Sequence, residues 1–492
     1  MNYRIKWLSS ICYASAMVAF AMTSCAEGCD DDERFNAGVS NTQLESPELD
    51  PNTFKIQINA DGSESVEVSW PVVFGAGGYL ANVQDITNPA NPVAIVKDSV
   101  IDGCKFSFPR LVDTKYEVSV STLGNDKLNN TASATPTIAM YSTFLPATII
   151  PEGMEISQFI AANLEASTEE TAFELEAGKN YKLTGEVNFG LTPITLRGDK
   201  YNRPFVEVSE EGVIVTQAGL KIKNINFDCS ASKPESSFIK LSPTPDASIS
   251  TEALGFKALG ANQNGYVIMG QIAIESCNFR NLPGSIIWGN KQPYSLNDFR
   301  ITDCIVQMKN ATSKTFIDFS SASGNTGLVK SMTLKNSTFY NLEENNSAYF
   351  FRYANPSNAD PQRTFGTGAT SIHTYDHCTL DRTFTGKDFA NNMPTVERFE
   401  VVWKDNIFYD VFRIYQYIRS NNVKRTTEGN IVYGPLSGIN SNDLKYATEA
   451  NPEFVGPTLL EFNLDEAKGG VNYRPQAAIC VENKTGDPRW YE

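Results

Sequence analysis

A six-residue pattern recurs seven times from residue 222 onwards, and this recurrence constrains the fold more than any other feature of the chain. The copies begin at residues 222, 274, 301, 334, 375, 403 and 427, and they read IKNINF, IESCNF, ITDCIV, LKNSTF, YDHCTL, WKDNIF and TEGNIV. Such uneven spacing argues against a tightly periodic solenoid. It suits a parallel β-helix, in which the strands keep their register while the loops between them vary in length.

The residue types inside the pattern predict how each coil is built. The first and sixth positions are mostly apolar, and the third is Asn, Ser, Asp, His or Gly, which tolerate unusual backbone angles. We therefore expect a bend at the third position, after which the fourth side chain points inward and stacks on its equivalents, about 4.8 Å apart. The fourth position holds Ile225, Cys277, Cys304, Ser337, Cys378, Asn406 and Asn430.

Most coils contain a second strand-like run, found as SIIW at 285, TFIDF at 315, YFFRY at 349 and RIYQYIR at 413. The run EISQFIAANLE at 155 has its apolar residues at helical spacing. Together these patterns predict a right-handed parallel β-helix over residues 150–492, capped at its start by a helix.

Residues 47–143 alternate apolar and polar side chains in short runs that are broken by turn residues. Examples are VEVSW at 66, YLANV at 79, CKFSF at 104 and YEVSVSTL at 116. This period of two predicts a β-sandwich. The whole chain is therefore expected to be all-β.

The first 24 residues have the layout of a signal peptide, with Arg4 and Lys6 followed by an uncharged stretch up to Cys25. Such a segment is removed either by ordinary secretory cleavage or by cleavage that leaves Cys25 as the lipidated first residue. Residues 25–46 contain the acidic run Asp30–Glu33 and are expected to form a flexible tether.

Composition excludes some functions. The formal net charge of -16 opposes nucleic-acid binding. With two histidines in the chain and no Cys-x-x-Cys spacing, we predict neither a metal site nor a cofactor. Any catalysis would use carboxylates, Lys, Arg or Tyr.

Several motifs resemble known families. Trp70 followed by Pro71, the Tyr79 strand, and Leu111 placed five residues before Tyr116 resemble a fibronectin type III domain. The residues before Cys25 resemble the lipobox of bacterial lipoproteins. With a pectate-lyase-like β-helix and the ending TGDPRW at 485, the chain resembles surface lipoproteins of Bacteroidota glycan-uptake loci, whose domains have no assigned function. This resemblance implies an outer-membrane location at the cell surface, lipid on Cys25 and a glycan transporter complex as a partner.

The motif HTYDHC at 373 is similar to a tryptophan-isoleucine-aspartate-histidine stretch of pectate lyases. The repeat register, however, assigns His377 to the bend and Cys378 to the interior. Asp376 shares the second, outward position with Lys335 and Lys404. Lysine beside carboxylate could abstract a proton next to a uronate, with calcium if the chain is a lyase. A surface ion pair is the alternative.

Read as a strand, RIYQYIR places Arg413, Tyr415, Tyr417 and Arg419 on one outer face. Tyrosine rings stack on sugar rings, and guanidinium groups bind carboxylates, so we predict glycan binding there. Coverage of these rings by a loop is the alternative.

The sequence thus favours a lipid-anchored, non-catalytic protein that holds an extracellular polysaccharide, pectin-like acidic glycans included, on a β-helix face. The alternative is a polysaccharide lyase or hydrolase that uses Asp376, Lys404 and Arg413. A structural or adhesive role is a third reading.

Overall fold

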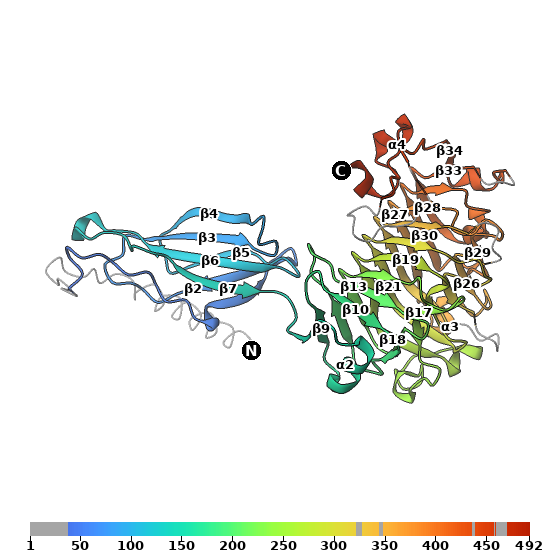
Figure 1. The fold of residues 1–492 in the computed structure, drawn as a ribbon, viewed down its shortest axis with the longest axis horizontal. Coiled ribbons are helices and arrows are strands. Elements are labelled where there is room, and N and C mark those ends of the chain that lie inside the picture. Colours follow the sequence, from blue (N-terminus) through green and yellow to red (C-terminus); the bar gives the residue numbers. More distant parts are fainter. Residues whose placement is uncertain (1–37, 321–326, 344–347, 435–437, 457, 459–469) are drawn as a thin grey trace, which may run out of the picture. The chain divides into compact units, whose positions relative to one another are not determined.

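The computed structural model describes residues 38–492 apart from 321–326, 344–347, 435–437, 457 and 459–469. The predicted signal peptide, Cys25 and the first part of the tether lie outside the described residues. The chain divides into two compact units, Met1–Phe144 and Leu145–Glu492 (Figure 1). Within the described part, no helix is both long and apolar enough to span a membrane.

The first unit consists of two antiparallel sheets that enclose one apolar core. One sheet has the order β1-β2-β5, and the other has the order β4-β3-β6-β7. The core includes Val66, Trp70, Tyr79 and Tyr116. The strands are β1 (Phe54–Ile58), β2 (Glu64–Ser69), β3 (Tyr79–Asp85), β4 (Val93–Ile101), β5 (Lys105–Pro109), β6 (Lys115–Thr122) and β7 (Thr137–Ser142).

The second unit is a parallel β-helix with three sheets, because every strand pairs with its equivalent in the next coil. Sheet D contains β8 (Ala147–Ile150), β9 (Thr171–Leu175), β12 (Ile194–Arg197), β15 (Leu220–Lys223), β18 (Tyr266–Glu275), β21 (Tyr294–Thr302), β24 (Val329–Lys335), β27 (Ser371–Asp376), β30 (Phe399–Lys404) and β32 (Lys424–Glu428).

The other two sheets follow sheet D within each coil. Sheet E contains β10 (Asn180–Leu183), β13 (Phe205–Val208), β16 (Asn226–Asp228), β19 (Asn278–Leu282), β22 (Ile305–Met308), β25 (Thr338–Asn341), β28 (Thr379–Asp381), β31 (Ile407–Tyr409), β33 (Ile431–Tyr433) and β34 (Thr448–Glu449). Sheet F contains β11 (Glu186–Asn188), β14 (Val213–Thr216), β17 (Ser237–Leu241), β20 (Ser285–Trp288), β23 (Ile317–Phe319), β26 (Phe351–Tyr353) and β29 (Ala390–Asn391).

The expected bend is confirmed at the junction of sheets D and E. All seven third-position residues have a positive φ, among them Asn224 at 57°, His377 at 54° and Gly429 at 63°. The strands before and after the bend are in register from coil to coil, as in the pairs Ile274↔Ile301 and Phe279↔Val306. The β-helix also begins before residue 222, where the pattern starts. The coil that contains β12 and β13 lacks the pattern because a longer loop from Gly198 to Pro204 replaces the tight bend.

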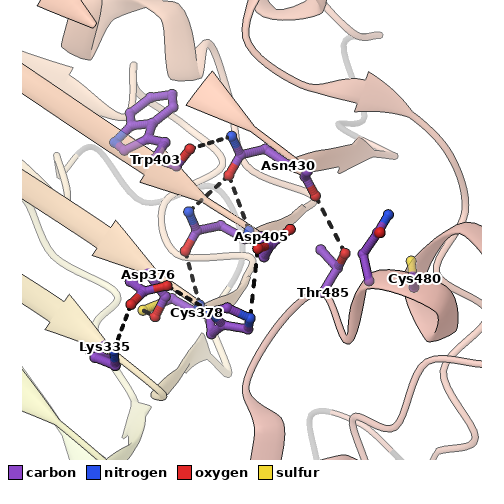
Figure 2. A network of polar contacts seen from close by, with 12 residues as sticks. Lys335, Asp376, Cys378, Trp403, Asp405, Asn430, Cys480 and Thr485 are labelled. Atoms are coloured by element: carbon purple, nitrogen blue, oxygen red, sulfur yellow. Dashed lines mark hydrogen bonds and ion pairs between the residues drawn. The ribbon is translucent and has the colours of Figure 1, made fainter. Parts of the chain in front are cut away.

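The fourth-position side chains are buried, as predicted, and each stands over the next. Polar members of this stack also accept hydrogen bonds: the backbone N–H of Cys277 donates to Cys304 Sγ (3.5 Å), and the N–H of Cys304 donates to Ser337 Oγ (3.1 Å). Further along, Asn406 Oδ1 accepts from the N–H of Cys378 at 2.9 Å (Figure 2). The bend turns this N–H away from both sheets, so a polar side chain of the following coil satisfies it.

The thiols in this stack are protonated. Burial raises the pKa of Cys277 to about 12, and its Sγ–H donates to the carbonyl oxygen of Glu275 at 3.3 Å. In the described part of the chain the six cysteines are free, namely Cys104, Cys229, Cys277, Cys304, Cys378 and Cys480. The repeated cysteines are therefore small hydrogen-bonding core residues.

The expected helix at the start of the β-helix is α2 (Ile156–Asn163), whose first turn is capped by the Glu155 carboxylate. Its residues Ile156 and Ile160 belong to the main core. Two other short α-helices are α3 (Pro361–Phe365) and α4 (Ala478–Asn483).

Residues 470–492 lie on the outer face of sheet E, and we call them the C-terminal cover. Tyr473 and Trp490 pack on Ile305 and Tyr340, and the indole N–H of Trp490 donates to Thr338 Oγ1 at 2.8 Å. The motif TGDPRW is therefore a structural anchor of the β-helix.

Candidate functional site

Asp376 lies at the end of strand β27, where Lys335 Nζ is 2.8 Å from its carboxylate (Figure 2). His377 Nδ1 lies 2.6 Å from the same carboxylate, and His377 Nε2 lies 3.7 Å from Asp405. The hydrogen bond with His377 and the ion pair with Lys335 lower the pKa of Asp376 to about 2. The structure thus places Asp376 in the ion pair that the sequence left as an alternative.

The three candidate catalytic residues do not converge on one point. Lys404 is exposed and occupies the position of Asp376 in the next coil of sheet D. Arg413 follows sheet F instead, since the N–H of Phe389 in the preceding coil donates to the carbonyl of Phe412. Its guanidinium lies 3.5 Å from Asp388.

The expectation of a strand at 413–419 is wrong. Arg413 has a left-handed φ of 49°, and Ile414–Ile418 form a 3-10 helix, η5. Because three residues complete a turn, Ile414, Tyr417 and Ile418 face the interior together. Tyr417 is fully buried and cannot share an outer face with Tyr415, which is partly exposed, or with Arg419, which is exposed.

Tyr417 is held inside by His373. His373 Nε2 lies 2.9 Å from the carbonyl oxygen of Val329, so this nitrogen donates, and Nδ1 accepts from the Tyr417 hydroxyl at 2.6 Å. Burial lowers the pKa of His373 to about 4, which keeps the ring neutral at pH 7. The first histidine of HTYDHC is thus a core residue.

A row of polar and aromatic side chains on the outer face of sheet F was not singled out from the sequence. It consists of one outward residue from each of five successive coils, in register from strand to strand. We call it the sheet F row; its members are Lys240, Trp288, Asp318, Arg352 and Asn391. The signal was present in the last letters of SIIW, FID and FFR, but aligning them requires the strand register.

Lys314 covers part of this row. Its ammonium lies 3.5 Å from the centre of the Trp288 ring. The loop that carries it is braced, because Asn310 Nδ2 donates to the Lys314 carbonyl and Thr312 Oγ1 accepts from the Lys314 N–H. Burial lowers the pKa of Lys314, and among the described residues no carboxylate forms an ion pair with it.

Asp318 and Arg352 are neighbours in the row and are positioned differently. Asp318 is 8% exposed and accepts hydrogen bonds from the N–H and the hydroxyl of Ser320. The Arg352 guanidinium lies 5.7 Å from the centre of the Tyr349 ring. Its Nε is buried and has no acceptor among the described residues, so it can still donate a hydrogen bond.

A cavity of about 250 Å³ lies beside the row, at the corner between sheets E and F. The loop that carries Lys314 contributes to its lining through Thr312. Asn281 Oδ1 is buried at this cavity and has no donor among the described residues. Polar members of the lining are Ser230, Ser232, Asn281, Lys309, Thr312 and Glu343.

The sheet F row and the side chains around Lys314 are together more basic than the chain as a whole. Lys240 and Lys291 lie close enough to Lys314 to disfavour its charged form, while Asp318 and Glu235 favour it. Adding Arg352 leaves four cations against two carboxylates, in a chain of net charge -16. Within the described residues, no group of three or more His, Cys, Asp or Glu side chains could hold a metal ion.

Comparison with known proteins adds two domain families without assigned roles. Residues 3–185 match a model described as a domain of unknown function (DUF4992), and residues 179–342 match a second domain of unknown function (DUF4957). No curated protein matches the chain.

Solved structures with some similarity include two pectate lyases. Pectate lyase PelI from Erwinia chrysanthemi is 11% identical over 58% of this chain and 85% of its own, with a TM-score of 0.18. Pectate lyase Pel3 from Pectobacterium carotovorum is 13% identical over 76% of this chain and 99% of its own, with a TM-score of 0.14. These scores support no argument, and the fold assignment depends on the strand pairing described above.

Proposed function

We propose that this protein binds an extracellular polysaccharide along the sheet F row and is not itself an enzyme. The observation that carries the proposal is the Trp288 ring with the Lys314 ammonium above it. Trp288 stays partly exposed beside Lys314 and offers apolar surface to a sugar ring, and an ammonium without a carboxylate partner offers a counter-charge. Arg352, with an unused donor nitrogen, adds a second cation on the same row.

The glycan in this proposal carries acidic sugars. Taking a lysine and an arginine out of water costs free energy unless an anion compensates them. A uronate or sulfate group supplies that charge, whereas a neutral sugar does not. The spacing of the row, one residue per coil, also suits a polymer that runs along the β-helix axis.

The cellular setting extends the proposal. Lipid on Cys25 would anchor the chain in the outer membrane with the β-helix at the cell surface, next to a glycan transporter complex. The leader sequence supports this part, and Cys25→Ala is expected to release the protein from the membrane fraction.

We further propose that residues 47–143 form a fibronectin type III-like spacer. The two sheets of three and four strands support it. So does Tyr116, whose hydroxyl accepts from the N–H of Leu111 at 2.7 Å and donates to the carbonyl of Pro109 at 3.2 Å, a corner typical of such sandwiches.

Affinity electrophoresis of the full-length chain in gels that contain polygalacturonate, heparin or neutral glucan tests the binding site. We expect an acidic polysaccharide to retard the protein, and Trp288→Ala and Lys314→Met each to weaken binding about tenfold. Lys424→Met, which removes an exposed lysine on sheet D, is the matched control. Retardation that survives both Trp288→Ala and Lys314→Met would refute the site.

A polysaccharide lyase is the second candidate, favoured by one observation. Burial lowers the pKa of Lys314, which makes its amine a better base for removing a proton next to a uronate. Unsaturated products that absorb in the ultraviolet, and that Lys314→Met abolishes, would establish the lyase. Retardation without such products supports binding alone.

A further inference from the structure

The outer face of sheet E changes character along its length. Beneath the C-terminal cover its outward residues are apolar, as at Ile305 and Ile407, or hydrogen-bonded to the cover, as at Thr338 and Asp381. In the first four coils they are mostly polar or charged. The polar and charged members there are Asn180, Lys182, Glu207, Asn226, Asp228, Asn278 and Arg280.

These first coils form a groove of about 490 Å³. Its floor is the outward face of β10, β13, β16 and β19, and the segment from Gly153 to Glu155 lines one end. Glu155 is bridged to β10 at Lys182, and its carboxylate accepts from the N–H groups of Gln158 and Thr184. The groove is therefore built on backbone that strand pairing and a helix cap hold in place.

Four charges lie in one row along the floor, in the order Lys182, Glu207, Asp228 and Arg280. Lys182 lies 3.7 Å from Glu207, and Asp228 forms an ion pair with Arg280. The row carries no net charge. It nevertheless presents hydrogen-bond donors at both ends and acceptors between them.

Phe205 stands beside this row. It is in register with Asn180 on one side and Asn226 on the other. The ring is partly exposed, and it packs at the edge of the cluster that contains Trp490. The apolar ring is thereby fixed next to groups that exchange hydrogen bonds with hydroxyls.

We propose that this groove is a second saccharide site, which takes an uncharged sugar unit. One face of a pyranose ring can lie on Phe205 while its hydroxyl groups bond to Glu207, Asp228 and Lys182. Because the four charges cancel in pairs, an anionic sugar gains no net attraction there and meets the carboxylates. The groove lies on a different sheet from the sheet F row, and its role does not depend on the proposed function of that row.

The test is saturation-transfer NMR of the full-length chain with four neutral hexasaccharides, those of cellulose, mannan, xylan and galactan. We expect at least one to bind in the millimolar range or tighter. Glu207→Gln and Phe205→Leu should each weaken that binding about tenfold, since the first weakens an acceptor and the second removes the ring.

Two controls keep the outcome clear. Glu186→Gln changes an exposed carboxylate on β11, outside the groove, and Trp288→Ala removes the ring of the sheet F row; both should leave neutral-sugar binding unchanged. Thermal melting checks that each variant folds. The proposal is overturned if no hexasaccharide binds, or if Trp288→Ala removes the binding while Phe205→Leu and Glu207→Gln leave it intact.

Discussion

Sheets E and F belong to the same coils, yet their outer faces differ. Outward residues of sheet E beneath the C-terminal cover are apolar or hydrogen-bonded to the cover, such as Tyr340 and Thr338. Those of sheet F include Trp288, Lys240 and Arg352, all at least partly exposed. The strand geometry is the same on both faces, so what packs on a face, and not its position in the coil, decides which side chains it carries.

The largest expected effect on stability comes from a substitution that disturbs the packing of the C-terminal cover on sheet E. Gly486 in the C-terminal cover has a φ of 91°, and a Cβ there would lie 2.7 Å from Thr379 Oγ1 and 2.8 Å from Ile407 Cδ1. We expect Gly486→Ala to lower the free energy of unfolding by about 3 kcal/mol, from backbone strain and overpacking together. Urea denaturation measures it.

The matched control is Gly368→Ala. Gly368 has a φ of 86°, but no atom lies within 4 Å of the added Cβ, so this variant bears the backbone strain alone. A loss of about 1 kcal/mol is expected. Equal losses in the two variants would mean that the C-terminal cover is not tightly packed on sheet E.

A smaller effect depends on pH. Burial raises the pKa of Asp381 to about 7; its Oδ2 accepts from the Tyr473 hydroxyl at 2.8 Å, and the charges of Arg382 and Asp410 lie nearby. The folded state therefore holds a proton that the unfolded state releases near pH 4, so this group's contribution to stability falls as pH rises from about 4 to about 7.

Asp381→Asn tests this pH dependence, because an amide keeps the hydrogen bond with Tyr473 and does not ionise. We expect the variant to gain stability relative to the wild type as pH rises from 4 to 8, by about 2 kcal/mol or more. Thermal melts at several pH values measure the difference. A difference that does not vary with pH would contradict the buried position of Asp381 under the cover.

The smallest effect concerns the ion pair on sheet D. Lys335 is about half exposed, so Lys335→Met should change the free energy of unfolding by less than about 1 kcal/mol. It should also leave retardation by acidic polysaccharide unchanged. A variant that lost retardation would move the binding site from sheet F to the face that carries Asp376.

The D–E bend could be predicted from the sequence because its requirements are local. A left-handed residue followed by a buried side chain recurs in all seven copies of the pattern, and this places Asn, Ser, Asp, His or Gly before Ile, Cys, Ser or Asn. Cys304 and Asn406 were expected inside because both occupy the fourth position of the pattern. That they accept a backbone N–H from the preceding coil was not foreseen, since the donor lies more than 20 residues away.

The segment 413–419 shows where this reasoning fails. Apolar and polar residues alternate there with a period of two, which suits a strand, but the left-handed Arg413 starts a 3-10 turn. Tyr417 lies inside, where its hydroxyl donates a hydrogen bond to His373, a residue 44 positions earlier. The residues around Tyr417 in the sequence therefore do not predict its contact with His373.

The sequence by itself determined the repeated bend, the inward fourth position and the β-helix, because each depends on backbone angles and side-chain size within six residues. Only the tertiary structure decided which outward faces stay open. Residues 470–492 fold back over sheet E and leave Lys240, Trp288 and Arg352 on sheet F partly exposed, and packing between distant segments has no local signature in the chain.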